Sequence, residues 1–188
     1  SFQAISATGA TPVACDVDAE TLCLDWRDAE KRLTPKTKAV MPVHYAGGVG
    51  ALDDIYAFAK KHSLRVIEDA AQAVGVRIDS RMAGTVGHIG VYSFHSHKNM
   101  TTLGEGGMLV ARDPEWAQIV PMLRHNGHRP YPVDRPDYWI PAMTDVTLPR
   151  LKGKALWPIN CCLGEVSCAL GTQLLDRVDE MNAQRRAR

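Results

Sequence analysis

Residues 39–69 read AVMPVHYAGGVGALDDIYAFAKKHSLRVIED, and this stretch decides the fold class. Residues 39–43 are an apolar run that ends in a glycine-rich turn, as a strand ends before the chain reverses. Residues 51–62 place apolar side chains at helical spacing, which is typical of a helix packed on a sheet. Residues 64–67 are another apolar run. A strand, a helix and a strand in this order predict two parallel strands joined by a crossover helix.

The same alternation continues on both sides of this stretch. The further elements that we predict are strands over residues 11–17, 76–78, 89–94 and 108–111, helices over 25–32 and 113–124, and one long helix from Leu163 onward. Strands and helices that alternate in this way predict an α/β fold with a mostly parallel sheet flanked by helices. Ligands of such sheets bind beyond the carboxyl ends of the strands, which is where Glu68 and Asp69 follow residues 64–67.

The composition excludes several classes of protein. The 188 residues are 45% hydrophobic and 23% charged, so the chain is neither disordered nor of low complexity. Its 22 basic and 21 acidic residues give a net charge of +1, which provides no field to attract nucleic acid or an anionic membrane. No apolar run approaches the roughly 18 residues that span a bilayer, and no signal peptide pattern opens the chain. Five cysteines without paired spacing indicate reduced thiols, and we expect a cytoplasmic protein.

Both ends of the sequence are expected to be truncated. Residues 1–7 resemble the last turns of a helix closed by Gly9, and no methionine precedes them. The chain stops at Arg188 within an amphipathic pattern. We therefore expect a piece of a longer protein. Residues 129–158, rich in proline and tryptophan and without a clear period, predict a functional or partner-facing loop that helps to shape a substrate pocket.

Two residues are candidates for chemistry. Lys98 follows a strand in a turn rich in small polar groups, where partial burial would make its amine a nucleophile. The alternative is a solvated loop lysine. Asp69 ends a strand and could pair with the ring nitrogen of a cofactor, or could simply cap a helix. A site for pyridoxal phosphate (PLP) needs both parts, a lysine and an acid. His95 and His97 lack a third ligand at suitable spacing, so no metal site is predicted.

Several longer motifs resemble one family. Taken together and in this order, they closely resemble the DegT/DnrJ/EryC1/StrS sugar aminotransferases, and the resemblance covers essentially the whole chain. The segments that carry the resemblance are 38–47 (KAVMPVHYAG), 66–73 (VIEDAAQA), 84–95 (GTVGHIGVYSFH), 98–99 (KN), 104–108 (GEGGM) and 160–175, which ends in ALGTQLL.

The resemblance implies a role for five residues. Lys98 matches the lysine that forms the internal aldimine with PLP and then moves protons at the substrate carbon. Asp69 matches the carboxylate at the pyridine nitrogen, and Gln72 a residue near the ring hydroxyl of the cofactor. Ser93 matches a hydroxyl at the cofactor phosphate, and Asn160 an asparagine that reaches the phosphate of the partner subunit. The family's site is thus built by a homodimer.

The resemblance also implies a fold and an activity. The fold would be the large domain of a type I (aspartate aminotransferase-like) PLP enzyme, with residues 1–158 as its PLP-binding portion and 159–188 as a long helix leading toward a C-terminal domain. The activity would be transfer of an amino group from an amino acid, usually glutamate, to a keto sugar, most often nucleotide-linked, in amino-sugar and polysaccharide biosynthesis. Residues 1–188 alone are expected to hold PLP weakly.

Two alternatives stay open within this resemblance. One is a synthase of an aminated aromatic precursor with the same fold, which also keeps the lysine. The other is a PLP-binding regulator without turnover. One departure from the family pattern bears on substrate binding: Cys162 stands where the family usually has an arginine, two residues after the asparagine.

Overall fold

A computed structural model describes residues 1–128, 146–147 and 155–188, with the backbone alone at 146, 147 and 155. The described chain forms two compact units. The first contains Ser1–Val110 and Val166–Arg188, and the second contains Ala111–Glu165. Most of the loop predicted over 129–158, and its expected part in a substrate pocket, lies outside the described residues.

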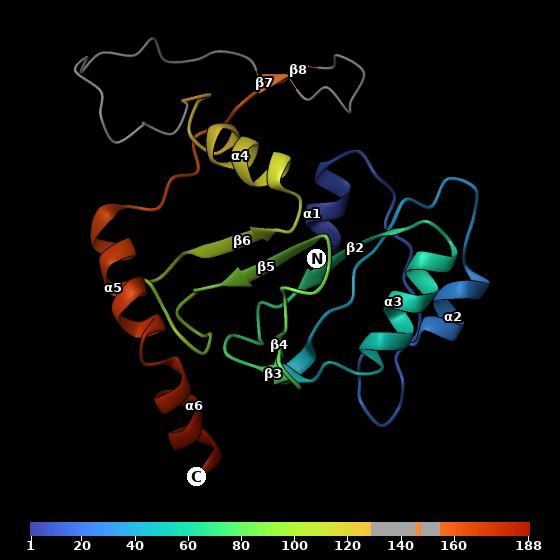
Figure 1. The fold of residues 1–188 in the computed structure, drawn as a ribbon, viewed down its shortest axis with the longest axis horizontal. Helices are drawn as coiled ribbons and strands as arrows, with labels where there is room; N and C mark the ends of the chain where they lie inside the picture. The colour runs from blue at the N-terminus through green and yellow to red at the C-terminus, as the bar shows by residue number, and fades with distance from the viewer. Residues whose placement is uncertain (129–145, 148–154) are drawn as a thin grey trace. The chain divides into compact units, whose positions relative to one another are not determined.

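A four-stranded sheet is the centre of the first unit (Figure 1). Its strands lie in the order β1, β2, β5, β6, and the first three run parallel. The arrow of β6 points opposite to that of β5 in Figure 1, so one edge of the mostly parallel sheet is antiparallel. The bounds are β1 (Ala39–Val40), β2 (Arg65–Asp69), β5 (Ile89–Ser93) and β6 (Gly107–Ala111).

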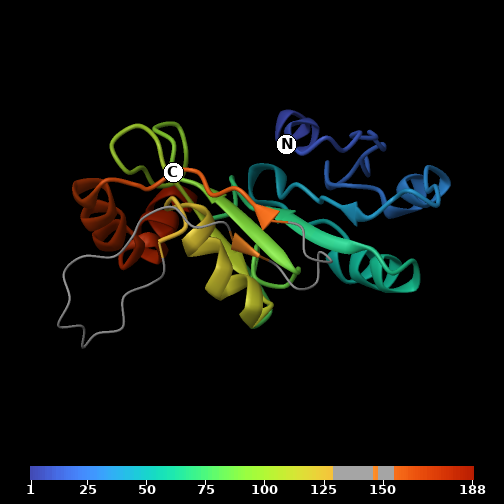
Figure 2. The same cartoon turned by 90° about the horizontal axis from the view of Figure 1, so that it is seen from above.

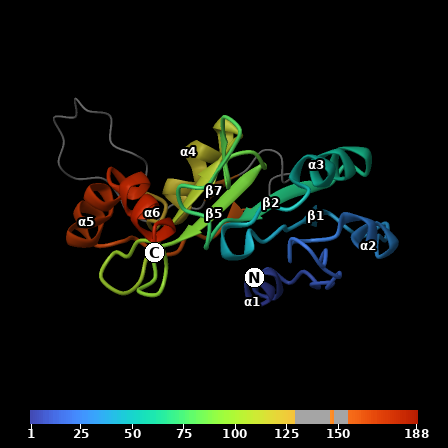
Figure 3. The same ribbon diagram turned by 90° about the horizontal axis from the view of Figure 1, so that it is seen from below.

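The predicted crossover helix joins β1 to β2. Helix α3 (Leu52–Lys61) buries Ile55 and Phe58 against Val66 of β2, which confirms the expected strand, helix and strand. Helix α2 (Trp26–Lys31) packs beside it and begins at Asp25, whose carboxylate accepts the Arg27 N–H at 2.9 Å. Figure 3 shows α3 on one face of the sheet and α1 (Phe2–Ala7) on the other.

Short elements connect the strands at the edge where β2 and β5 end. A 3₁₀ turn, η1 (Tyr45–Gly47), follows β1. An antiparallel ribbon of β3 (Arg77–Ile78) and β4 (Arg81–Met82) follows β2. The strand predicted over 76–78 is therefore confirmed as β3, whereas its partner β4 was not predicted.

The chain from Leu163 onward is two helices, so the prediction of one long helix is wrong. Helix α5 (Glu165–Leu175) ends before a two-residue turn, and α6 (Val178–Arg186) begins after it. Val178 then packs in an apolar cluster with Val74, Phe94 and Met100. Figure 2 shows α5 and α6 beside the loop between β5 and β6. The turn between α5 and α6 changes the direction of the chain so that α6 packs beside this loop. Burial of Val178 stabilises this arrangement.

The described residues of the second unit contain one helix of ten residues. Helix α4 (Pro114–Leu123) begins after Asp113, whose side chain accepts the Glu115 N–H at 2.9 Å, as predicted for this segment. Strands β7 (Val146–Thr147) and β8 (Ala155–Leu156) pair antiparallel.

Residues 11–17 form no strand, which corrects another prediction. Only an isolated bridge joins Val17 to Leu24, and the side chains of Val13 and Val17 are about half exposed or more. The apolar run has no sheet neighbour in the described chain to pair with. Within the part of the chain that the structure describes, no helix combines the length and the apolar character needed to cross a bilayer.

Candidate active site

Asp69 and Ser93 lie at the same edge and on the same face of the sheet. Asp69 is the last residue of β2 and Ser93 the last of β5. Asp69 is in register with Val91, and residues two apart along a strand point to the same side. The carboxylate and the hydroxyl therefore project from neighbouring parallel strands where ligands of such sheets bind.

The Asp69 carboxylate accepts two hydrogen bonds. Its Oδ1 accepts the Ala71 N–H at 3.2 Å, and its Oδ2 accepts the Ser1 hydroxyl. The chain after Asp69 makes turns at residues 71–72 and 74–75 instead of a helix. The alternative that Asp69 merely caps a helix is therefore wrong.

Lys98 and Gln72 line one hollow. The hollow has a volume of about 450 Å³ and is bordered by the turn of η1, the chain after β2, the loop after β5 and helix α6. A volume of this size falls in the usual range for small-molecule sites, about 300–1,000 Å³. Lys98 is half-buried and is one of the residues that line this hollow, and its role as the cofactor lysine stays a prediction.

The loop that carries Lys98 is held at both ends. Backbone hydrogen bonds of 2.8 Å join Phe94 N–H to the Gly106 carbonyl and Ser96 N–H to the Gly104 carbonyl. Met100, two residues beyond Lys98, is buried in the same apolar cluster as Phe94. Gly104 and Gly106 thus close the loop at its base, and Lys98, between the two ends, lines the hollow.

Gln72 is held by the turn after β1. The Ala46 N–H donates to Gln72 Oε1 at 2.8 Å, across 26 residues of sequence. Ala46 has a φ of 51°, and Gly47 follows with a φ of 83°. A left-handed residue pair of this kind turns the chain tightly, and glycine adopts it without strain. This turn directs the backbone donor at the amide.

Asn160 lies in the second unit. It forms an antiparallel bridge with His125 at the end of α4, and its side chain accepts the Cys162 N–H at 3.3 Å. Asn160 and Cys162 are both exposed. The role expected of Asn160 toward a partner subunit stays a prediction.

Sequence reasoning missed a buried pair behind Asp69. His44 Nε2 lies 2.7 Å from Glu68 Oε2, and both side chains are at most 1% exposed. Burial alone would raise the pKa of Glu68, but hydrogen bonds from His44 and from the Gly87 and Gly84 N–H groups outweigh it and lower the pKa to about 2. An acidic residue in an apolar strand was the available signal.

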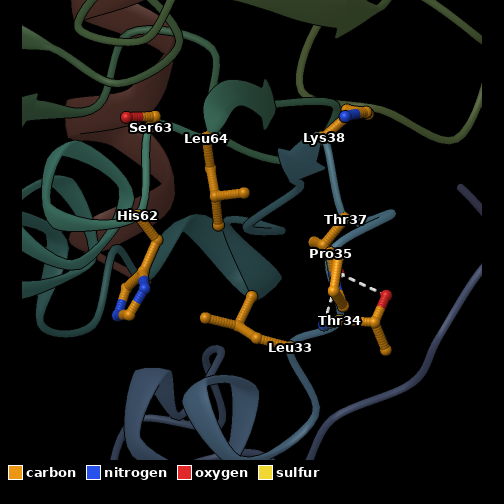
Figure 4. Close-up of a pocket in the computed structure, with 8 residues that line it drawn as sticks. All are labelled: Leu33, Thr34, Pro35, Thr37, Lys38, His62, Ser63 and Leu64. Carbon is orange, nitrogen blue, oxygen red and sulfur yellow. Dashed lines mark hydrogen bonds between the residues drawn. The ribbon is translucent and has the colours of Figure 1, made fainter.

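A second hollow lies at the other end of the sheet (Figure 4). It has a volume of about 320 Å³, and two of its lining residues, Lys38 and Leu64, come just before β1 and β2. Its other lining residues include His62 and Leu33. Because it lies at the amino ends of the strands, it is separate from the edge that carries Asp69 and Ser93.

His95 and His97 contact each other, with ring centroids 5.0 Å apart. An acidic residue, Glu105, lies 3.7 Å from His95 Nε2. No group of three or more His, Cys, Asp or Glu residues arranged to hold a metal occurs among the residues that the structure describes. None of the five cysteines forms a disulfide within the described chain.

Known proteins are similar to this chain in sequence and in fold. The sequence model of the DegT/DnrJ/EryC1/StrS aminotransferase family matches residues 1–188. GDP-perosamine synthase of Caulobacter vibrioides is 36% identical over 185 residues, which make up 98% of this chain and 45% of that protein. L-glutamine:2-deoxy-scyllo-inosose aminotransferase of Micromonospora echinospora is 37% identical over 183 residues, 97% of this chain and 41% of that protein. The crystal structure of an aminotransferase from Psychrobacter cryohalolentis superposes with a TM-score of 0.84 at 34% identity, covering 99% of this chain and 45% of that one.

The mostly parallel sheet and its neighbours among solved structures define the class: this is the fold of the large domain of type I PLP-dependent transferases, as predicted. The chain belongs to the DegT/DnrJ/EryC1/StrS aminotransferase family. It spans less than half the length of the curated relatives that it matches.

Proposed function

We propose that this protein is a PLP-dependent aminotransferase that moves an amino group from an amino acid to a keto sugar, most often nucleotide-linked, in amino-sugar and polysaccharide biosynthesis. One observation carries the proposal: Lys98 and Gln72 line one hollow formed in part by the chain that follows β2, while β2 and its neighbour β5 end in Asp69 and Ser93, which are not among the lining residues. One relative is named as a GDP-perosamine synthase and another as an aminotransferase of 2-deoxy-scyllo-inosose, which supports a sugar-like acceptor.

The residues present fit PLP. The hollow offers an amine from Lys98 and an amide from Gln72, and the adjacent edge offers a carboxylate from Asp69 and a hydroxyl from Ser93. The amine suits the carbonyl group of PLP, and the amide suits its ring hydroxyl. The carboxylate suits the ring nitrogen, and the hydroxyl suits the phosphate. When bound, PLP supplies an electron sink for the pair left behind when a proton leaves the substrate carbon.

Each residue then has a task. With PLP bound, the Lys98 amine would hold the cofactor through its carbonyl carbon, and once freed by the amino donor it would carry the proton between the substrate carbons. The Asp69 carboxylate keeps the ring nitrogen protonated. Gln72 donates toward the ring hydroxyl while Ala46 fixes its carbonyl oxygen, and Ser93 donates to the phosphate.

The proposal extends to the assembly. We take the active form to be a cytoplasmic homodimer in which Asn160 of each subunit reaches the phosphate bound by the other. The donor is glutamate by the family resemblance, and glutamine is the second donor to test because one relative is named for it.

Amino transfer to a sugar tests the proposal. The intact protein is loaded with PLP and supplied with glutamate or glutamine and a set of nucleotide-linked keto sugars. The products are identified by mass spectrometry. We expect an amino sugar to form with the native protein and none with Lys98→Ala, while Lys36→Ala, at an exposed loop position, behaves as the native protein. Turnover of aromatic precursors alone would favour the synthase, and PLP binding without any amino transfer would favour the regulator.

A further inference from the structure

The buried pair of His44 and Glu68 lies directly behind the proposed cofactor residue Asp69. Glu68 and Asp69 are consecutive in β2, so their side chains project from opposite faces of the sheet. The Asp69 face carries the candidate site, and the Glu68 face packs toward α3. Nothing in the proposed reaction uses Glu68, although a fully buried carboxylate is costly to keep.

Four donors satisfy the Glu68 carboxylate. Oε2 accepts from His44 Nε2 and from the Gly84 N–H, each at 2.7 Å. Oε1 accepts from the Val86 N–H at 2.8 Å and from the Gly87 N–H. Because its pKa is lowered to about 2, Glu68 is ionised, and His44 Nε2 therefore carries the proton of this bond.

Two further titratable groups face this carboxylate. The Tyr56 hydroxyl from α3 helps to lower the pKa of Glu68. Tyr92 lies on β5, and its pKa is raised by burial and by the negative charge of Glu68. The carboxylate is thus enclosed by α3, β5, the turn at 84–87 and the segment after β1.

The same segment after β1 holds the backbone of Asp69. His44 N–H donates to the Asp69 carbonyl at 3.0 Å, and Asp69 N–H donates to the Pro42 carbonyl at 2.9 Å. Two residues further on, Ala46 holds Gln72. His44 therefore joins the buried carboxylate, by its side chain, to the segment that holds both predicted cofactor residues.

We propose that Glu68 is a positioning residue for Asp69, acting through His44 and the turn at 84–87. This rests on the proposed function. Without its negative charge, residue 68 is a weaker acceptor for the His44 imidazole and for three backbone N–H groups. Because these donors are buried and have no water to bond instead, we expect the end of β2 to shift. A carboxylate displaced by about 1 Å from the ring nitrogen costs roughly 100-fold in rate.

The test compares variants of the intact protein, using PLP as the probe. Glu68→Gln keeps the shape but not the charge, and Glu20→Gln, at an exposed loop position, is the matched control. His44→Leu removes the donor, and His44→Gln retains an N–H near the position of Nε2. Measured are the Kd of PLP, the pH dependence of its visible absorbance when bound, kcat and KM, and the far-ultraviolet circular dichroism.

We expect Glu68→Gln and His44→Leu to stay folded, to weaken PLP binding by about tenfold or more, and to shift the pH at which the bound cofactor changes its absorbance. We expect kcat to fall far more than KM rises, and His44→Gln to recover most of the loss. Should Glu68→Gln not fold, the two His44 variants decide in the same way.

Folded variants with the native Kd and the native pH response would overturn the positioning role while leaving the aminotransferase standing. Failure of the native protein to bind PLP would instead overturn the proposed function, and the positioning role with it.

Discussion

At the residue scale, one carboxylate shows how the site edge is built. Glu68 is buried with four donors around it, and its pKa of about 2 lies below the ordinary value of 4.5. A neighbouring residue, Asp69, is left on the other face for chemistry. The same dipeptide therefore provides both the support and the functional group.

The lowered pKa of Glu68 predicts an acid-dependent stability. A group whose folded pKa is below its unfolded pKa stabilises the fold above pH 4.5 and loses this contribution as the pH falls toward 2. From about pH 6 to about pH 3 the loss from Glu68 amounts to roughly 2 kcal/mol in the free energy of unfolding.

Urea unfolding at those two pH values measures this difference. Glu68→Gln is expected to show a smaller decrease in the free energy of unfolding than the native chain, with Glu20→Gln as the control that keeps the native decrease. Equal decreases in Glu68→Gln and the native chain would contradict the role given to this carboxylate.

At the element scale, two glycines allow the turn at 84–87 to lie against β5. A Cβ at Gly90 would overlap the carbonyl oxygen of Gly84, and a Cβ at Gly84, whose φ is 89°, would overlap the Tyr92 hydroxyl. Gly84 also donates to Glu68. The close approach of turn and strand is thus part of the support for the site.

Gly90→Ala tests this approach. Because backbone atoms cannot move aside as a flexible side chain can, we expect a loss of about 3 kcal/mol or more in the free energy of unfolding. The denaturation midpoint reports it, and Gly164→Ala, where a Cβ meets open space, is the control. A Gly90→Ala chain as stable as the native one would show that the turn does not pack there.

Asn182 and Arg185 join helix α6 to the Lys98 loop, and Asn182 also joins it to the chain after Asp69. Its Nδ2 donates to the Val74 carbonyl at 3.0 Å, and its Oδ1 accepts from Asn99 Nδ2 at 3.4 Å. Arg185 adds a 2.6 Å bond to the Asn99 carbonyl, next to Lys98 in the chain. The helix therefore supports both the chain after Asp69 and the loop of the lysine.

We expect Asn182→Ala to lower the free energy of unfolding by about 1–3 kcal/mol, because it leaves the buried Val74 carbonyl without this donor. Gln184→Ala, on the same helix but bonded to Glu180 one turn away, is expected to change it by less than about 0.5 kcal/mol. Chemical denaturation compares the two, and similar effects from both would contradict the role of Asn182.

At the scale of the whole molecule, the sequence predicted those strands and helices that the spacing of apolar residues reveals. Alternating apolar runs located β2, β5 and α3 correctly, and they placed Asp69 at the carboxyl end of a strand. Two predictions failed because they depended on contacts between distant residues. Leu174, Val178 and Met181 continue one helical pattern, yet packing of Val178 against Val74 accompanies a break after Leu175.

The support of the site escaped prediction for the same reason. A histidine and a glutamate 24 residues apart carry no local mark of pairing, and the turn at 84–87 meets them only in the folded chain. The run over 11–17 looks like a strand in sequence and is not one, because a strand also needs a neighbour. Residue types indicated which side chains could do the chemistry, whereas tertiary contacts determine how these side chains are positioned.

The central claim is that the Lys98 amine attaches covalently to PLP. The most direct measurement is reduction of the PLP-loaded intact protein with borohydride, followed by peptide mapping by mass. The account predicts a pyridoxyl group on Lys98 and on no other lysine. A folded protein that yields no adduct, or carries it on a different lysine, would contradict the account.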